Sequence, residues 1–422
     1  MSGNIQSTQT VPAHAGVTIA LCMAVAVLEG FDIQAIGVAA PKLGPELGLA
    51  ADKLKFIFTI SNVGLVVGAA FGGRLADRFG RKPVFMASVA AFGLFTVCTA
   101  LASTFETLFA ARLLTGLGFG AALPNLMAVA AEISPPEKRA ATATTMFCGM
   151  PLGGGTVALL TQVLPDGFDW RILFYVGGLL PLVLVPALWA YMPETLQKRS
   201  ASVPTQKRVP AMRALFGEGR AWPTLLLWIA FFPTLFILYL ILNWLPLLAT
   251  AKGLSADTAP QASIAFNFAS AAGALVIGRI VDKFGGKWPL TLSYLALIGS
   301  LVGLAGATQQ AAILFWSGAA GVFLMGANYA LYGVGASYYP TAMRGTGSGA
   351  SIAVGRVGSI AGPYLAGDLL AGGVTAAGVV MFMAPFAAVA GVAVFVLGFF
   401  RPAGDDAAVG AEGIDQNAVA AK

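Results

Sequence analysis

Charge is scarce in this sequence. Only 10% of the 422 residues are Asp, Glu, Lys or Arg, whereas 57% are hydrophobic and the mean hydropathy is +0.80. A soluble domain carries about 25% charged residues, so this chain has too few charges to cover a surface that faces water. The shortage excludes a soluble enzyme, a nucleic-acid-binding protein and a disordered scaffold. The composition instead predicts an all-α polytopic protein that crosses a lipid bilayer many times.

Histidine and cysteine are almost missing as well. The one histidine, His14, lies in the polar N-terminal stretch, and the three cysteines, Cys22, Cys98 and Cys148, lie in apolar stretches without paired spacing. We therefore predict no metal site, no organic cofactor and no enzymatic activity. Residues 1–15 lack both a basic segment and a small-residue cleavage site, so no cleaved signal peptide is expected.

Twelve apolar segments are long enough to span a membrane. A hydrocarbon core of about 30 Å requires roughly 20 apolar residues in a helix. Segments of that length lie near 16–40, 55–75, 83–103, 107–131, 140–164, 170–192, 221–249, 259–280, 288–306, 311–337, 346–370 and 376–400. A polar connector at 193–220 separates the first six from the last six, and tails at 1–15 and 401–422 flank them. The pattern predicts two six-helix bundles, at 16–192 and 221–400.

Lysine and arginine are distributed unevenly over the predicted loops. If both ends of the chain face the cytoplasm, 18 of the 25 basic residues lie on the cytoplasmic side and five lie in the opposite loops. The remaining two, Arg112 and Arg356, lie inside predicted spans. Because basic residues favour the cytoplasmic side of membrane proteins, we expect a multi-pass protein of the inner membrane with both termini in the cytoplasm.

The two halves of the chain repeat one motif. The stretch from Gly73 to Lys82, after the second span, reappears 205 residues later after the eighth span. Pro135 reappears at the same offset as Pro340. An internal repeat of this length indicates a duplicated six-helix unit, which is typical of secondary transporters.

The repeated stretches combine glycine, aspartate and basic residues. Glycine allows two helices to approach closely, and the aspartate can accept hydrogen bonds from amides at a helix N-terminus or pair with the basic residues. We interpret the repeat as a gating latch in cytoplasmic loops, the alternative being a basic turn that only fixes topology. The residues concerned are Gly73, Asp77, Arg78, Gly80, Arg81, Lys82, Gly278, Asp282 and Lys283.

The repeated stretch resembles the signature of the major facilitator superfamily. Residues 73–82 match the family's pattern Gly-x-x-x-Asp-Arg-x-Gly-Arg-Lys in full, and residues 278–287 match its weaker second copy. Arg112, followed by Gly116 and Gly120, resembles a second signature whose arginine is associated with proton coupling in the family. The antiporter-type signature of the fifth span is largely missing. The resemblance covers roughly residues 16–400 and implies two pseudo-symmetric six-helix bundles that work by alternating access.

Four ionisable residues lie inside predicted spans. A charge there costs about 2.5–3.5 kcal/mol on insertion scales, so each is a functional candidate. Glu29 and Asp32 are three residues apart and share one helix face. By helical rise, Arg112 lies near the level of Asp32, and Arg356 near that of Glu29. We hypothesise that Glu29 and Asp32 bind the coupling proton and that Arg112 tunes Asp32. Arg356 is the expected partner of an anionic substrate. The alternative is that the four residues only neutralise one another.

The first span contains a motif that resembles one family within this superfamily. Residues 29–37, which include Glu29, Asp32 and Gln34, resemble the Asp-Gly-x-Asp motif of the aromatic acid:proton symporter family, and most of all its 3-(3-hydroxyphenyl)propionate transporter branch. Glu29 stands where that motif has aspartate. Residues 243–246 and 355–363 fit the same family. The resemblance implies import of an aromatic carboxylate together with protons.

An aromatic acid requires a cation for its carboxylate, an apolar or aromatic slot for its ring and an amide for a ring hydroxyl. Each polar or aromatic candidate also has a structural alternative, because Tyr and Trp favour membrane interfaces and Asn bridges helices. The candidates that join Arg356 in the predicted substrate site are Gln34, Asn125, Tyr239, Asn243, Trp244, Asn267, Tyr329 and Tyr332.

These observations predict a proton symporter that imports 3-(3-hydroxyphenyl)propionate or a related hydroxylated aromatic acid. The proton is the coupling ion, the lipid bilayer is the environment, and the chain is expected to work as a monomer without nucleic acid. The alternatives are a carrier of the same superfamily for another small organic anion or a sugar, and, least favoured, a membrane sensor on a transporter scaffold. A channel would show a repeated pore-lining ring, and the sequence has none.

Overall fold

The chain forms thirteen helices in the part that the structure describes. The structure is a computed structural model that describes residues 15–134, 139–194, 210–340 and 343–400. The first half contains α1 (Ala15–Glu46), α2 (Ala51–Phe79), α3 (Arg81–Ala100), α4 (Phe105–Ile133), α5 (Arg139–Val163) and α6 (Arg171–Tyr191). The second half contains α7 (Ala211–Phe216), α8 (Ala221–Thr250), α9 (Pro260–Phe284), α10 (Lys287–Gly306), α11 (Gln310–Ser337), α12 (Arg344–Ala371) and α13 (Ala376–Leu397).

Each predicted span coincides with one long helix, and the predicted fold class is confirmed. Among the described residues, ten helices are long and apolar enough to cross a membrane. The other two long helices, α5 and α12, have 25 and 28 residues; α5 is rich in glycine and threonine, and α12 is rich in glycine and serine. Several helices extend past the predicted spans, as α1 does to Glu46, because hydropathy marks only the hydrocarbon core. The six-residue α7 lies inside the predicted connector and is too short to be found by hydropathy.

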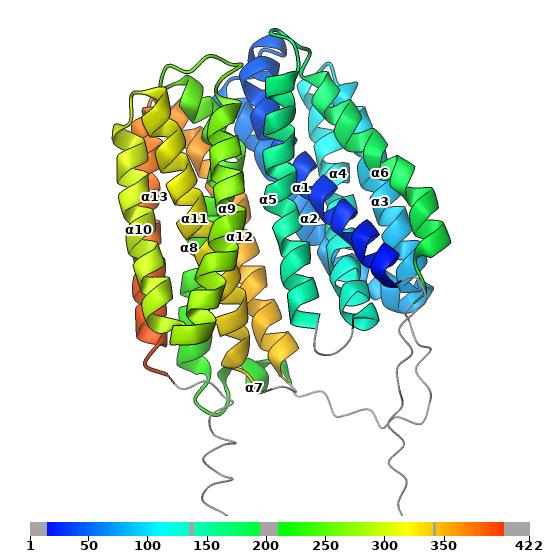
Figure 1. Ribbon diagram of the computed structural model, residues 1–422, viewed down its shortest axis with the longest axis vertical. Coiled ribbons are helices and arrows are strands. Elements are labelled where there is room, and N and C mark those ends of the chain that lie inside the picture. Colours follow the sequence, from blue (N-terminus) through cyan, green and yellow to red (C-terminus); the bar gives the residue numbers. More distant parts are fainter. Residues whose placement is uncertain (1–14, 135–138, 195–209, 341–342, 401–422) are drawn as a thin grey trace, which may run out of the picture.

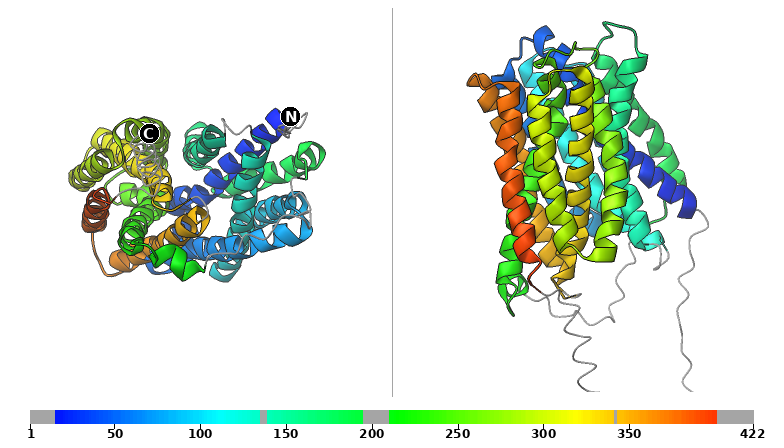
Figure 2. Two further views of the ribbon diagram at one scale, coloured as in Figure 1. Left: turned by 90° about the horizontal axis from the view of Figure 1, so that it is seen from below. Right: turned by 60° about the vertical axis from the view of Figure 1, so that its left-hand side comes forward.

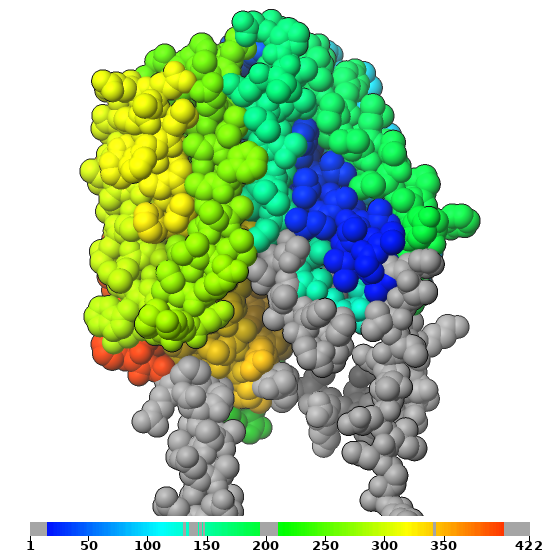
Figure 3. All heavy atoms as spheres, in the orientation of Figure 1, coloured from blue at the N-terminus to red at the C-terminus, as the bar shows by residue number. Residues whose placement is uncertain are grey.

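The long helices pack in two groups that follow the chain. Helices α1–α6 pack mainly among themselves, and so do α8–α13, so that Figures 1 and 2 show two groups side by side. Between the groups, α2 packs on α12, α5 on α9 and α1 on α8. Figure 3 shows α9 meeting α5 along this boundary. Because α2 and α5 correspond to α9 and α12 in the repeat, the first two contacts are equivalent, as expected for a duplicated unit.

Glycine accounts for the closeness of the main helix pairs. A Cβ atom on Gly68 of α2 would lie 2.2 Å from the carbonyl oxygen of Leu117 on α4. In the second half, a Cβ atom on Gly321 of α11 would lie 2.2 Å from the carbonyl oxygen of Phe266 on α9. Only a residue without a side chain allows such backbone contact. The same device therefore packs equivalent helix pairs in both halves.

Polar contacts join the two groups on the side opposite α7. Lys42 on α1 pairs with Asp257, between α8 and α9, at 2.7 Å, and Lys55 on α2 pairs with Asp368 on α12. The amide of Gln162 on α5 donates to the carbonyl oxygen of Asp257 at 2.8 Å. On the α7 side, no ion pair crosses between the groups within the described residues. Partly exposed ion pairs contribute about 0–1 kcal/mol each, so these pairs break at low cost.

Candidate functional site

A cavity lies between the two groups of helices and brings together six of the predicted substrate residues. Its wall is formed by α1, α4 and α5 of the first half and α8, α9, α11 and α12 of the second. The remaining wall is mainly apolar and includes Ile33, Leu123, Leu235 and Met325. The predicted residues in it are Gln34, Tyr239, Asn267, Tyr329, Tyr332 and Arg356.

Arg356 supplies the positive charge of this cavity. Its Nη1 donates to the hydroxyl oxygen of Tyr239 at 2.6 Å, and its guanidinium lies 5.8 Å from the Tyr239 ring centroid. No carboxylate lies within ion-pair distance of it in the described part of the chain. Gly358, two residues further along α12, lets α12 approach α8, because a Cβ there would lie 2.2 Å from the carbonyl oxygen of Phe232. The arrangement leaves most donors of a guanidinium free for an anion.

Glu29 is buried without a hydrogen-bond partner among the described residues, within the electrostatic influence of Arg356. Its side chain is 1% exposed, and neither carboxyl oxygen is hydrogen-bonded among the residues described. The charge that attracts it is that of Arg356. Burying a carboxyl group without a partner is costly, so such a group inside a span is a functional candidate. The structure therefore leaves Glu29 as a candidate for the coupling proton.

Asp32 has the opposite environment, because each of its carboxylate oxygens accepts a hydrogen bond. Arg112 Nη1 on α4 donates to its carboxylate at 2.8 Å, and the hydroxyl of Thr96 on α3 donates to it at 2.7 Å. Arg112 Nε also donates to the Ser61 hydroxyl on α2 at 3.1 Å. Both charged side chains are 0–1% exposed. The predicted pairing of Asp32 with Arg112 is present, and it joins α1, α2, α3 and α4.

Gln34 and Asn267 form a reciprocal pair across the two groups. Gln34 Nε2 donates to Asn267 Oδ1 at 2.9 Å, and Asn267 Nδ2 donates to Gln34 Oε1 at 2.7 Å. Gly154 on α5 makes room for this pair, because a Cβ there would lie 1.7 Å from Gln34 Nε2. The two carboxamides satisfy each other in the empty cavity, and they connect α1 directly to α9.

Three other predicted substrate residues lie outside the cavity wall. Asn125 donates to the carbonyl oxygen of Ala121 on its own helix at 2.8 Å. Asn243 likewise donates within α8, to the Tyr239 carbonyl oxygen at 2.7 Å. Trp244 Nε1 donates to the carbonyl oxygen of Pro363 at 2.9 Å and ties α8 to α12. These side chains serve the helices and their packing.

Sequence reasoning missed Asn328, which lies in the cavity wall beside the predicted Tyr329. It is 3% exposed, and its Oδ1 has no hydrogen-bond partner among the described residues. The signal was present in the sequence, since an amide inside a span is as unusual as those of Gln34 and Asn267.

The repeated motif lies at helix ends and not in extended loops. Gly73 lies within α2, and Gly80 is the single residue between α2 and α3, with φ 101°. In the second copy Gly278 lies within α9, and Gly285 has φ 77°. The prediction that the motif lies in loops is therefore wrong. Glycine accepts a positive φ, so a single residue can make most of the turn between two helices. The basic and acidic residues of the motif therefore lie on helix ends.

Glu194, which sequence reasoning also missed, caps the start of α3. Its carboxylate accepts from the backbone amides of Arg81 at 3.0 Å and Lys82 at 3.2 Å. The motif aspartate, Asp77, is exposed and has no hydrogen bond or ion pair in the described residues, so the predicted capping by Asp77 is not seen.

Arg81 of the same motif pairs with Glu132 on α4 at 2.7 Å. The hydrogen bonds and ion pairs of Arg81 and Lys82 in the described part of the chain thus stay within the first half of the chain. Pro135 and the basic residues at 198–208 lie outside the described residues.

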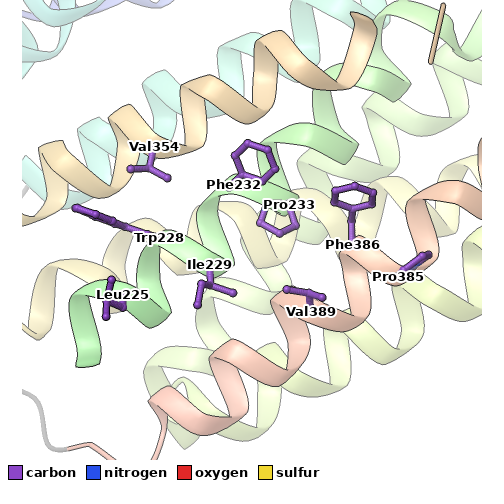
Figure 4. Close-up of a pocket in the computed structure, with 9 residues that line it drawn as sticks. All are labelled: Leu225, Trp228, Ile229, Phe232, Pro233, Val354, Pro385, Phe386 and Val389. Atoms are coloured by element: carbon purple, nitrogen blue, oxygen red, sulfur yellow. The ribbon is translucent and has the colours of Figure 1, made fainter. Parts of the chain in front are cut away.

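A second cavity has a different character and lies between α8, α12 and α13 (Figure 4). Its side chains are apolar or aromatic, with Trp228 and Phe232 from α8, Val354 from α12 and Phe386 from α13. It offers no charged group, so it has nothing to bind a carboxylate. The cavity between the bundles is the better candidate for an anionic ligand.

Comparison with known proteins decides the family. Residues 22–363 match the Major Facilitator Superfamily. The chain belongs to this superfamily. The match confirms the predicted family and, with it, the predicted class of protein, a membrane transporter and not an enzyme.

Three relatives cover most of the chain. It is 40% identical to the 3-(3-hydroxy-phenyl)propionate transporter of Escherichia coli (strain K12) over 387 residues, which are 90% of this chain and 93% of that transporter. It is 33% identical to the gallate transporter of Pseudomonas putida over 386 residues, 85% of this chain and 86% of that protein. It is also 33% identical to the 4-hydroxybenzoate transporter PcaK of Pseudomonas aeruginosa over 415 residues, 90% of this chain and 92% of that protein. The predicted branch is confirmed.

Solved structures share the fold at low sequence identity. A bacterial homolog of the human lysosomal transporter Spinster, in an inward-facing and unoccupied conformation, matches with a TM-score of 0.77 and 16% identity over 92% of this chain and 97% of that one. The xylose transporter XylE from E. coli, in an inward open conformation, matches with a TM-score of 0.72 and 16% identity, covering 92% and 96%.

Proposed function

We propose that this chain is a proton symporter that imports an aromatic carboxylate across the inner membrane. The observation that carries the proposal is Arg356, a cation without a carboxylate partner among the described residues, in a mainly apolar cavity between two bundles. A guanidinium grips a carboxylate with two parallel hydrogen bonds. Relatives named as transporters of 3-(3-hydroxy-phenyl)propionate, gallate and 4-hydroxybenzoate support this substrate class.

The substrate carboxylate binds Arg356 and Tyr239, and the ring lies against the apolar and aromatic wall. Tyr329 and Tyr332 from α11 and Met325 line this part of the cavity. Aromatic side chains pack on a ring edge-to-face or offset, and the thioether of Met adapts to its shape. A sugar, the alternative substrate, needs no cation, so the charge of Arg356 favours an organic anion.

Glu29 carries the proton, and Arg356 links it to the substrate. In the empty carrier, an ionised Glu29 is attracted by Arg356. A substrate carboxylate that occupies Arg356 removes this attraction and adds a second negative charge nearby, so Glu29 takes up a proton. Substrate and proton then enter and leave together. Asp32 and Arg112 hold the helices around Glu29 in place throughout.

Alternating access follows from the contacts between the bundles. The pairs Lys42–Asp257 and Lys55–Asp368 close the side opposite α7 and break when the bundles rock. The side that carries α7 faces the cytoplasm in this proposal, so both chain ends are cytoplasmic, and one chain forms the whole pathway as a monomer.

The direct test is uptake by proteoliposomes that contain the purified protein. We expect an inward proton gradient to drive accumulation of 3-(3-hydroxyphenyl)propionate, gallate or 4-hydroxybenzoate, with protein-free liposomes as the control for passive entry of the acids. One proton moving with one monovalent carboxylate transfers no net charge, so accumulation should respond to the pH gradient and not to membrane potential. Uptake that ignores the pH gradient contradicts symport, and failure to take up any aromatic acid contradicts the substrate class.

Replacement of Arg356 by lysine tests the carboxylate site. Lysine keeps the charge but loses the planar fork, so we expect substrate affinity to fall by about 1.5–3 kcal/mol, or roughly ten- to a hundredfold. The measurement is the substrate concentration that gives half-maximal uptake. Arg279→Lys, on an exposed arginine of α9, is the matched control. Unchanged affinity in Arg356→Lys would remove Arg356 from the carboxylate site.

A further inference from the structure

Asn328 differs from the other carboxamides of the central cavity because its oxygen has no partner. It belongs to α11, lines the cavity and is 3% exposed. None of the described residues donates a hydrogen bond to its Oδ1. Gln34 and Asn267 in the same wall satisfy each other. A buried acceptor left without a donor destabilises the empty site, and a ligand that brings a donor relieves this.

Asn328 and Arg356 line the same cavity from different helices, α11 and α12, so a ligand that fills the cavity can contact both. Asn328 and Tyr332 are four residues apart and therefore share one face of α11, about 6 Å apart along the axis. Tyr332 interacts electrostatically with Arg356. Asn328 therefore lies one helical turn from Tyr332, in the cavity wall that also contains Arg356. Met325, three residues before Asn328, extends the same face with an apolar side chain.

We propose that Asn328 accepts a hydrogen bond from a hydroxyl group on the substrate's aromatic ring and so selects hydroxylated aromatic acids. The inference rests on the proposed function, because it requires an aromatic carboxylate in this cavity. A phenolic hydroxyl on the ligand can donate a hydrogen bond to Asn328 Oδ1, which none of the described residues does. A site built to bond a hydroxyl rejects the analogue that lacks it, because the buried acceptor then stays unpaired. Arg356 thereby recognises the carboxylate and Asn328 recognises the ring substituent.

The test compares two acids that differ by one hydroxyl, 3-(3-hydroxyphenyl)propionate and 3-phenylpropionate. Half-saturating concentrations for uptake are measured with the wild-type protein and with Asn328→Leu, which keeps the side-chain size and removes the acceptor. We expect the wild-type preference for the hydroxylated acid to fall roughly ten- to a hundredfold in Asn328→Leu, mainly through weaker binding of that acid. Asn125→Leu is the matched control, because Asn125 is also 3% exposed but lies outside the cavity wall, and it should change both acids by one factor.

The outcomes separate the inference from the proposed function. If wild-type protein takes up neither these nor other aromatic acids, the proposed function fails and the inference with it. If it takes up both acids without preference, or if Asn328→Leu leaves the preference unchanged, only the inference is overturned. Should Asn328→Leu not fold, judged by gel filtration in detergent, Asn328→Ser replaces it: its shorter side chain withdraws the acceptor, and the same loss of preference is expected. A preference retained in Asn328→Ser then overturns the inference.

Discussion

Asp32→Asn is expected to abolish transport and to lower the free energy of unfolding by about 3–5 kcal/mol. The change removes one partner of a buried ion pair whose members are 0–1% exposed. Arg112 cannot give up its charge, so it is left buried without a counterion. The hydrogen bond from Thr96 weakens as well, because its acceptor loses its charge. Since the pair joins four helices of the first bundle, its loss affects the framework that holds Glu29.

Thermal unfolding of the purified protein in detergent measures this effect, with Asp52→Asn at an exposed position of α2 as control. The double variant Asp32→Asn/Arg112→Met removes both charges, and replacing a whole buried pair by neutral residues is often close to neutral for stability. We expect the double variant to be more stable than Asp32→Asn and still inactive. An Asp32→Asn protein with wild-type stability would contradict the role of the pair, and full transport would remove Asp32 from the mechanism.

The fold could be predicted from the sequence because its determinants are local. An apolar stretch of about 20 residues is a span whatever its neighbours are, and the 205-residue repeat pairs the helices of the two halves. Hydropathy could not give the true ends of α1 or the existence of α7, since both lie outside the hydrocarbon core. It also could not show that Gly80 alone forms the turn between α2 and α3, because this depends on its positive φ.

The candidate site was predicted less completely, because depth in the membrane does not show which way a side chain points. Arg112 and Asp32 were matched correctly by depth, since both belong to helices that pack together. Asn125 and Trp244 have suitable chemistry, yet each donates to a backbone carbonyl instead of the cavity. Which face of a helix borders the cavity depends on crossing angles and on the glycines that set them. Neither the crossing angles of the helices nor the close contacts at these glycines can be derived from the sequence alone.

The two acidic residues of α1 were also expected to act alike, and their surroundings separate them. Three residues along the helix, Asp32 pairs with Arg112 from α4, whereas the carboxyl group of Glu29 has no hydrogen-bond partner among the described residues and is influenced by the charge of Arg356. One carboxylate therefore has an ion-pair partner, and the other has none among the described residues. This difference is the reason why we propose Glu29 as the residue that carries the coupling proton, and it leads to the second large effect.

Glu29→Gln is expected to remove proton-driven accumulation while exchange of substrate persists. Glutamine has the size of protonated glutamate and cannot release a proton, so the carrier stays in the form that binds and moves substrate. A gradient of one pH unit is worth about 1.4 kcal/mol per proton and supports roughly tenfold accumulation; in Glu29→Gln this should fall to none. The fixed neutral residue is also no longer attracted by the charge of Arg356, so return of the empty carrier slows.

A counterflow experiment distinguishes the loss of proton-driven accumulation from the slower return of the empty carrier. Vesicles loaded with unlabelled acid exchange it for labelled acid through the loaded carrier alone, so Glu29→Gln should exchange at a rate close to that of the wild type while failing to accumulate substrate against a gradient. Glu106→Gln, an exposed glutamate at the start of α4, is the matched control and should keep both activities. If Glu29→Gln still accumulates substrate in response to a pH gradient, another group carries the proton. If exchange is lost together with accumulation, Glu29 serves substrate binding or folding, because a residue that only carries the coupling proton is not needed for exchange.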